Sequence, residues 1–121
     1  MSGTCYFLSD DKKSFSESES ACRNKGGKMA EPKDQNTDKI VHEAAKSKWN
    51  SDHYWIGIKE VGSSWKFLSV GSTVAWTNWY TGNPVQPNES KDQARCVYMQ
   101  TEYEERFDAH CSSNKYYICE L

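Results

Sequence analysis

The stretch Tyr54-Trp55-Ile56-Gly57-Ile58 constrains the fold of this chain more than any other segment. Strand residues alternate between faces, so Trp55 and Gly57 share one face and the other three residues share the opposite face. Both faces are apolar or small, which is typical of a central strand buried on both sides. Gly57 leaves a gap that another side chain or a backbone segment can enter. Helical signals precede this strand, and short strands and a long polar loop follow it, so the order indicates an α+β domain.

A first helix is expected between Ser14 and the pair Gly26-Gly27. Ser14 and Glu17 have the Ser-x-x-Glu spacing of a capping box, in which each side chain accepts a hydrogen bond from a backbone N–H at the start of the helix. Glycines in the left-handed conformation commonly end a helix, as this pair is expected to do. The stripe that faces the core is expected to contain Phe15, Ala21 and Cys22, and the serine and glutamate residues between them to face water.

A second helix is expected to begin at a cap on Asn36 or Thr37 and to run to about Lys48. Its apolar face is expected to hold Ile40, Val41, Ala44 and Ala45. Short apolar runs predict the remaining strands at 5–8, 28–30, 65–68, 96–99, 106–109 and 116–119. A chain of 121 residues suits one core, so residues 1–121 are expected to form a single domain.

The segment from Tyr80 to Arg95 is polar, contains Pro84 and Pro87, and shows neither the helical nor the strand period. A loop of this length without secondary structure is usually functional or disordered in a small domain. The segment is therefore the first candidate for a binding site.

Charge and cysteine content exclude several classes of function. The net charge of −2 argues against nucleic acid and anionic membranes as main partners, and no apolar run approaches the roughly 18 residues of a membrane span. Only 36% of the residues are hydrophobic, and five cysteines in a chain with so small a core indicate an oxidised, secreted domain. These cysteines form no Cys-x-x-Cys pair, and the histidines show no zinc-finger spacing. No signal peptide is visible, so export is inferred from the cysteines.

Several short motifs follow one another along almost the whole chain, from Cys5 to Leu121. They are Phe15…Ala21-Cys22, Gly26-Gly27, Ala30-Glu31-Pro32, Trp55-Ile56-Gly57, Trp76-Thr77-Asn78-Trp79, a proline-containing loop motif and Cys96…Cys111…Cys119. In their order and spacing they resemble the C-type lectin-like domain. The resemblance implies a C-type lectin-like fold of the α+β class, with two helices packed on small antiparallel sheets and a long ligand-binding loop.

The spacing of the cysteines alone leaves their pairing open. The resemblance implies the disulfides Cys22–Cys119, between the first helix and the last strand, and Cys96–Cys111, beneath the long loop. Cys5 is left over. An odd cysteine in a secreted protein indicates an intermolecular bond, here a Cys5–Cys5 homodimer, or an unpaired thiol.

The long loop contains the motif Gln86-Pro87-Asn88. In sugar-binding members of the family, Glu-Pro-Asn or Gln-Pro-Asp at this place carries two calcium ligands on either side of a cis proline, and sugar hydroxyls complete the calcium shell. Calcium takes roughly six to eight oxygen ligands. The resemblance therefore implies a calcium and carbohydrate site formed by Gln86, Asn88 and Asp108, with Asp92 as a further ligand if the loop bulges.

Three departures from the family pattern weaken the case for calcium. Ala94 stands where a loop glutamate is expected, with Arg95 beside it, and Phe107 replaces the asparagine before Asp108. The loop motif itself has no carboxylate, so calcium binding is expected to be weak or absent. A second register, Asn83-Pro84-Val85, offers fewer ligands because valine has no side-chain oxygen.

Other features of the loop bear on specificity. The resemblance links Gln-Pro-Asp with galactose-type and Glu-Pro-Asn with mannose-type sugars, so Gln86 slightly favours galactose. Trp79, Tyr80 or Tyr98 could stack on the apolar face of a sugar, with core packing as the alternative for each. Asn88-Glu89-Ser90 is an Asn-x-Ser sequon, and a glycan on Asn88 would cover the proposed site.

The first functional hypothesis is a soluble carbohydrate-binding lectin that recognises glycans or simple sugars, with calcium as its cofactor. The alternative is a calcium-independent, protein-binding module of the same fold, which can form a disulfide-linked dimer. An enzyme is not expected, because His42, His53 and His110 accompany no nucleophile, zinc-protease or phosphate-loop motif.

Overall fold

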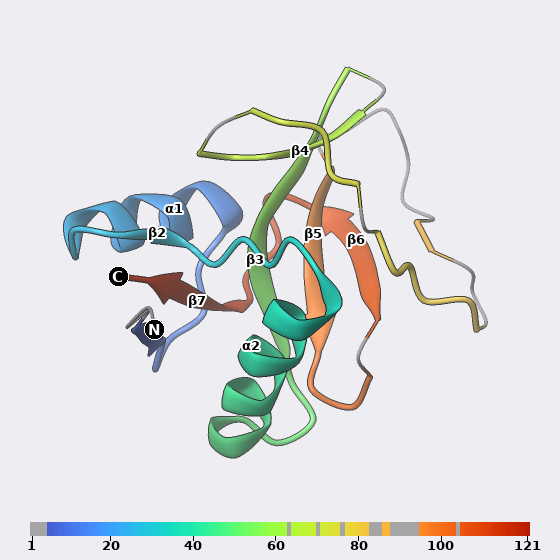
Figure 1. The fold of residues 1–121 in the computed structure, drawn as a ribbon. Helices are drawn as coiled ribbons and strands as arrows, with labels where there is room; N and C mark the ends of the chain where they lie inside the picture. Colours follow the sequence, from blue (N-terminus) through green and yellow to red (C-terminus); the bar gives the residue numbers. More distant parts are fainter. Residues whose placement is uncertain are drawn as a thin grey trace.

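A computed structural model describes residues 5–62, 64–69, 71–75, 77–82, 86–87, 95–103 and 105–121 of the chain (Figure 1). The elements in chain order are β1 (Tyr6–Leu8), α1 (Phe15–Asn24), β2 (Lys28–Met29), α2 (Gln35–Lys48), β3 (His53–Val61), β4 (Ser64–Phe67), β5 (Arg95–Gln100), β6 (Arg106–His110) and β7 (Tyr116–Glu120). Each predicted helix and strand is found, with differences at the ends. Neither described helix has the length and apolar character that a membrane span requires.

β3 is the central strand of the sheet, as its two apolar faces predict. The strand order is β1-β7-β3-β5-β6, with β2 paired to β7 and β4 paired to β3. Among the described strands, the antiparallel arrangement is confirmed for every pair except β3–β7, which is parallel and places Tyr54 opposite Tyr116. The exception arises because the chain leaves β6 and crosses to the other side of β3 before it enters β7.

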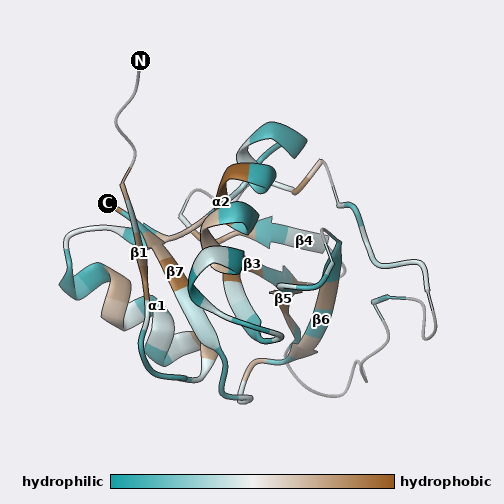
Figure 2. Ribbon diagram, turned by 90° about the horizontal axis from the view of Figure 1, so that it is seen from below, coloured by the Kyte–Doolittle hydropathy of each residue, from teal (hydrophilic) through white to brown (hydrophobic). Residues whose placement is uncertain are grey.

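The alternation of side chains along β3 divides the core into two parts. Tyr54 and Ile56 belong to the same buried cluster as Val41 of α2, whereas Trp55 belongs to the cluster of Phe15 of α1. The two helices therefore cover opposite faces of the central strand. The hydropathy colouring shows hydrophilic residues over much of both helices and an apolar stretch in β7 (Figure 2).

Gly57 is required by the close approach of another backbone segment. Its N–H donates to the Ala30 carbonyl at 2.7 Å. A Cβ atom at this position would lie 2.9 Å from Cγ of Glu31 and 3.2 Å from the carbonyl oxygen of Met29, distances that a real side chain does not tolerate without a shift of its neighbours. The predicted gap beside the central strand is thus filled by the segment around the end of β2.

The predicted start of the first helix is confirmed, and that of the second is wrong by a few residues. Ser14 is the N-cap of α1, and its reciprocal hydrogen bonds with Glu17 form the capping box. α2 is capped by Asp34, whose carboxylate accepts a hydrogen bond from the Thr37 N–H at 2.8 Å, and not by Asn36 or Thr37. Aspartate caps a helix as well as asparagine does, so a run of candidate caps does not identify the first turn.

The buried faces of both helices differ from the expected apolar stripes. On α1, Phe15 and Cys22 are buried as predicted, but Ser18 is buried as well, because its hydroxyl donates to the carbonyl one turn earlier at 2.8 Å. On α2, Ile40 is 58% exposed, although it was expected to face the core. The buried row of α2 contains Val41, and its neighbour Ile40 is rotated about 100° away from that row.

Both disulfides that the resemblance implies are present. Cys22 bonds to Cys119 across 97 positions of sequence, and Cys96 bonds to Cys111 across 15 positions. Cys5 is exposed and belongs to neither of these bonds. The first disulfide joins α1 to β7, and the second joins the start of β5 to the end of β6.

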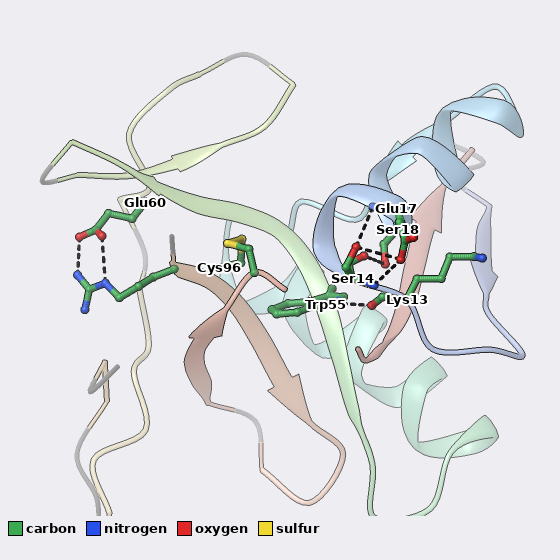
Figure 3. The surroundings of a disulfide bond; sticks show 9 residues. Lys13, Ser14, Glu17, Ser18, Trp55, Glu60 and Cys96 are labelled. Atoms are coloured by element: carbon green, nitrogen blue, oxygen red, sulfur yellow. Dashed lines mark hydrogen bonds and ion pairs between the residues drawn. A yellow bond between two sulfur atoms is a disulfide. The ribbon is translucent and has the colours of Figure 1, made fainter. Parts of the chain in front are cut away.

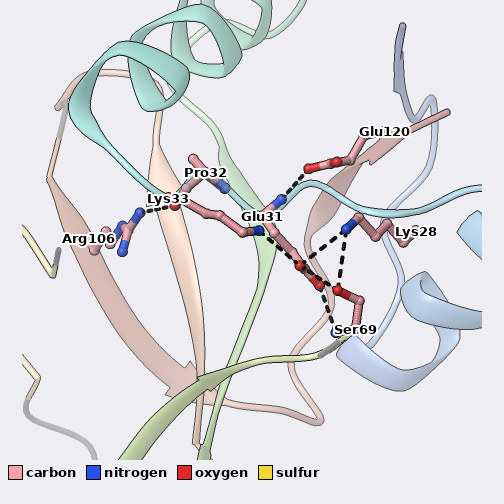
Figure 4. A network of polar contacts seen from close by, with 7 residues as sticks. All are labelled: Lys28, Glu31, Pro32, Lys33, Ser69, Arg106 and Glu120. Atoms are coloured by element: carbon pink, nitrogen blue, oxygen red, sulfur yellow. Dashed lines mark hydrogen bonds and ion pairs between the residues drawn. The ribbon is translucent and has the colours of Figure 1, made fainter. Parts of the chain in front are cut away.

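A buried carboxylate holds the segment that follows β2 (Figure 4). Glu31 accepts hydrogen bonds from the N–H and the hydroxyl of Ser69, both at 2.8 Å, while its own N–H donates to the Glu120 carboxylate at 2.6 Å. Two ammonium groups compensate its charge, Lys28 at 3.5 Å and Lys33 at 3.6 Å. The network connects the turn after β4 with β2 and β7.

Arg106 makes a second connection, between β6 and the α2 side of the molecule (Figure 4). Only 1% of Arg106 is exposed. Its Nη2 atom donates to the Pro32 carbonyl at 2.9 Å and lies 3.6 Å from the Asp38 carboxylate on α2. Burial lowers the pKa of the Arg106 guanidinium from its ordinary value, and Asp38 opposes that shift. The buried charge is therefore compensated by groups from two other segments.

Both ends of the described chain lie at one edge of the sheet. β1 pairs with β7, which places Tyr6 opposite Glu120, and the Leu121 N–H donates to the Cys5 carbonyl at 2.8 Å. Gln86 contacts β6, the strand at the other edge. The chain ends and Gln86 therefore lie at opposite edges of the sheet (Figure 1).

Candidate functional site

The candidate site lies where the ends of three strands meet. Glu60 is near the C-terminal end of β3, Arg95 begins β5 and Asp108 lies within β6. In the β5–β6 register, Val97 is opposite Asp108, and Arg95 is two residues before Val97. Because strand side chains alternate, Arg95 and Asp108 point to the same face of the sheet. The pairing of the strands therefore brings a cation and carboxylates together.

The Arg95 guanidinium lies between two carboxylates. Its Nε atom donates to Oε1 of Glu60 at 3.0 Å, and its Nη2 atom donates to Oε2 of the same group (Figure 3). Its Nη1 atom lies 3.5 Å from Oδ2 of Asp108. Arg95 is 5% exposed and Asp108 is 2% exposed. Hydrogen bonding to Glu60 is the main cause that raises the pKa of Arg95 above its ordinary value, so the guanidinium stays charged.

The rings of Trp65 and Trp79 pack against each other beside this ion cluster. The Arg95 guanidinium carbon lies 5.1 Å from the centre of the Trp65 ring, a geometry that adds a cation–π attraction. Trp79 packs edge-on against Trp65 with ring centres 4.9 Å apart, and it pairs with the backbone of Arg106. Trp79 is half-buried and packs against the core, one of the two alternatives that the sequence left open. Its stacking on a sugar stays a prediction.

Gln86 contacts the backbone of Asp108, whereas the carboxylate of Asp108 is buried and faces Arg95. A shared ligand site of the two side chains stays a prediction. The Asp108 N–H donates to Oε1 of Gln86 at 3.3 Å. The Gln86 N–H donates to the Tyr80 carbonyl at 2.9 Å, and the Gln86–Pro87 peptide bond is cis. The loop motif is therefore anchored on β6 through the side chain of its first residue.

The remaining predicted ligands cannot be placed beside these two. Asn88, with its sequon, and Asp92 lie outside the described residues, as do Ala94 and the alternative motif at 83–85. Their roles in a calcium or sugar site stay predictions. Among the described part of the chain, no group of three or more His, Cys, Asp or Glu side chains is arranged to hold a metal ion.

The described donors do not fit a calcium ion as they are arranged. The Asp108 carboxylate faces the Arg95 guanidinium, and a calcium ion at the same oxygens would meet that positive charge. The Gln86 carbonyl oxygen already accepts a backbone hydrogen bond. Calcium needs roughly six to eight oxygens, of which these two side chains would supply a small share.

Phe107 points into a cluster of aromatic rings. Its ring centre lies 4.8 Å from that of Tyr80 and 5.3 Å from that of Tyr98, and both pairs are stacked. Tyr103 packs on Tyr80 at 5.0 Å and is 40% exposed. The position where the family pattern has an asparagine is therefore occupied here by a packing residue.

The aromatic cluster continues to a histidine and a lysine. His53 stacks on Tyr98 with ring centres 4.8 Å apart, and Nζ of Lys115 lies 4.0 Å from the centre of the same ring. Lys115 Nζ is 3.4 Å from Nδ1 of His53. Burial lowers the pKa of His53, and the charges of Lys115 and Lys12 add to that shift while Asp52 opposes it.

We expect protonation of His53 to destabilise the fold at acidic pH. Because the folded pKa is lowered, the unfolded chain binds this proton more readily than the folded protein does. The contribution to stability is therefore complete above the ordinary histidine pKa of about 6.5 and decreases as the pH falls below it. Urea unfolding at a series of pH values measures this effect. As the pH falls below about 6.5, the free energy of unfolding should decrease less for His53→Gln than for the wild type. Identical pH profiles for the two proteins would contradict this expectation.

Three residues of this site were not identified from the sequence as functional. The sequence patterns single out Arg95 only as the neighbour of Ala94, place Trp65 in a strand and do not indicate Glu60. The signal that could have found them is the charge of Arg95 at the start of a strand expected to be buried. Such a charge needs an acidic partner.

Comparison with known proteins identifies the family. The family model described as "Lectin C-type domain" matches residues 11–121, so the chain belongs to the C-type lectin domain family. The human protein C-type lectin domain family 3 member A is 30% identical over 119 residues, which cover 97% of this chain and 59% of that protein. A perlucin-like protein of Mytilus galloprovincialis is 26% identical over 119 residues, which cover 95% of this chain and 74% of that protein. The chain thus spans about three fifths of the length of the first of these relatives.

Solved structures share the fold. The carbohydrate-recognition domain of the mouse scavenger receptor C-type lectin superimposes with a TM-score of 0.83 at 24% identity, covering 100% of this chain and 90% of that one. A complex of SPL-1 with GlcNAc superimposes with a TM-score of 0.82 at 18% identity, covering 100% and 89%. These neighbours confirm the C-type lectin-like fold, and the family model that matches the chain is that of a lectin domain, in agreement with the expectation that the chain is not an enzyme.

Proposed function

We propose that this chain is a secreted carbohydrate-binding lectin whose site is the rim formed by the Gln86-Pro87 motif and β6. The observation that carries the proposal is the hydrogen bond from the Asp108 N–H to Gln86 Oε1 at 3.3 Å, which fixes the loop motif on the sheet. Membership of the C-type lectin domain family supports a sugar as the ligand. SPL-1, which shares the fold, is known in complex with GlcNAc.

Gln86 would recognise the sugar as a hydrogen-bond donor. Its carbonyl oxygen accepts a hydrogen bond from the Asp108 N–H, and the NH₂ group of a glutamine side chain can only donate. Trp79 would offer the partly accessible ring on which the apolar face of a sugar stacks. Asn88 and Asp92, which the sequence assigns to the same loop, would supply further donors and acceptors. The glutamine at the start of the motif slightly favours galactose-type over mannose-type sugars.

Calcium is the part of the sequence-based hypothesis that the described residues support least. The expected ligand set is Gln86, Asn88, Asp92 and Asp108, and Asp108 is paired with Arg95. We therefore propose that the sugar hydroxyls are bound by direct hydrogen bonds. Chelation of calcium is the direct test of this choice.

The decisive experiment is binding to a glycan array, in about 5 mM calcium and again in EDTA. The wild type should bind at least one glycan, with equal signals in the two buffers. Gln86→Ala should weaken that binding about five- to tenfold, because it removes a hydrogen bond worth about 1 kcal/mol. Gln35→Ala, which truncates an exposed glutamine at the start of α2, is the matched control and should bind like the wild type.

Two outcomes would contradict the proposal in different ways. The absence of binding to any glycan in calcium would rule out lectin activity on that array. Binding that EDTA abolishes would retain the lectin and restore calcium as its cofactor.

A second candidate is a calcium-independent, protein-binding module, favoured by the same Arg95–Asp108 pair at the expected metal position. The exposed Cys5 would allow such a module to act as a disulfide-linked homodimer. Comparison of gel mobility with and without a reducing agent tests the dimer. A pull-down of partner proteins that EDTA does not affect, together with an empty glycan array, would favour this candidate over the lectin.

A further inference from the structure

The ion cluster at the candidate site joins two acidic side chains through one basic side chain of the same protein. Glu60 and Asp108 contribute two negative charges, and Arg95 contributes one positive charge between them. All three side chains are largely removed from water, with exposed side-chain fractions of 16%, 0% and 6% respectively. Buried carboxylates are stable in their charged form only when a cation or hydrogen bonds compensate them. Here the compensating cation is part of the chain.

Arg95 pairs with acidic side chains of two different strands, as a bridging metal cation would. The guanidinium forms two parallel hydrogen bonds with Glu60 of β3 and an ion pair with Asp108 of β6. Trp65 of β4 supplies a ring face 5.1 Å from the guanidinium carbon. One side chain therefore connects three other strands at the edge where the loop motif is anchored.

The anchor of the loop depends on Asp108 as well. The backbone N–H of Asp108 holds Gln86, and the carboxylate of Asp108 faces Arg95. A shift of β6 away from β5 would move both contacts together. Arg95 is thus placed to keep the anchor of the loop in position.

We infer that Arg95 acts as a built-in cation that assembles this edge of the sheet, so the edge forms without calcium. Arg95 is a positioning residue under this inference, because it acts through Asp108 and is too buried to reach a ligand. This role of Arg95 does not depend on sugar binding. The test measures only the melting temperature, so it is also valid if the protein binds no glycan.

The experiment measures the melting temperature of the whole chain in EDTA, in about 10 mM calcium chloride and in sodium chloride of the same ionic strength. The wild type should melt at one temperature in all three buffers. Arg95→Gln removes the charge and should lower the melting temperature in EDTA by on the order of 10 °C. Calcium, but not sodium chloride, should then raise the melting temperature of this variant, because the carboxylates of Glu60 and Asp108 have lost the guanidinium that paired with both of them.

Arg23→Gln is the matched control, because Arg23 is an exposed arginine paired with Glu19 on α1, away from the site. It should melt like the wild type in every buffer. Melting of Arg95→Gln at the same temperature as this control would overturn the inference. Loss of stability in Arg95→Gln that calcium does not reverse would overturn it too, since Arg95 would then be a packing residue only.

Calorimetric titration of the wild type with calcium covers the case in which Arg95→Gln does not fold. No binding heat is expected, and this result supports the inference. Saturable heat, or a calcium-dependent rise in the melting temperature of the wild type, would overturn it because the edge would then hold its own metal.

Discussion

Replacing Cys22 and Cys119 together by alanine should lower the free energy of unfolding by about 4–5 kcal/mol. The bond closes a loop of 97 positions, and release of so long a loop increases the entropy of the unfolded chain. Both cysteines are fully buried, so alanine introduces no polar group into the core. Urea unfolding, followed by tryptophan fluorescence, measures the effect directly.

The second disulfide provides the matched control. Cys96 and Cys111 enclose only 15 positions, so their replacement by alanine should cost about 3 kcal/mol. The variant that lacks the Cys22–Cys119 bond should therefore be less stable than the variant that lacks the Cys96–Cys111 bond. The opposite order would show that strain or residual structure in the unfolded chain, and not the length of the loop, determines the contribution of each bond.

Arg106→Gln should destabilise the protein by about 3–5 kcal/mol, the range for removal of one partner from a buried ion pair. The substitution leaves the Asp38 carboxylate, which is 3% exposed, without the guanidinium that lies 3.6 Å from it. It also removes the hydrogen bond to the Pro32 carbonyl. The midpoint of urea unfolding should fall with little change in slope, because the folded structure exposes no additional surface.

Arg23→Gln again controls for the loss of an arginine, and should change stability by less than about 1 kcal/mol because its ion pair is exposed. The double variant Arg106→Gln with Asp38→Asn should recover part of the loss, since no buried carboxylate is then left uncompensated. Additive losses in the two single variants would show that Arg106 and Asp38 do not act as a pair.

Much of the fold could be predicted because it depends on local patterns. The capping box of Ser14 and Glu17 and the alternation of residues 54–58 each act over a few residues, and both are found in the structure. The start of α2 was placed too late because Asp34, Asn36 and Thr37 are all suitable caps. The parallel pairing of β3 with β7 could not be predicted, since it depends on how the chain crosses from β6.

The candidate site was predicted less completely, for a physical reason. The resemblance implies a ligand site shared by Gln86 and the Asp108 carboxylate, whereas the contact in the structure is with the backbone N–H of Asp108. The partner of Arg95 is Glu60, which lies 35 positions away in sequence and reaches it only through the pairing of β3 with β5. Ion pairs between distant strands carry no local signature, so a sequence shows the charge but not its partner.

The adjacency of the two chain ends determines how copies of this domain would be displayed. Because β1 and β7 lie side by side, a tag or tether on either end leaves the molecule from nearly the same point. The Gln86 rim is at the far edge of the sheet, so copies fixed to a support through either end would all turn that rim toward the solution. Under the proposed lectin function, an array of such copies would engage several sugar residues at once, and the avidity of the array would exceed the affinity of a single copy.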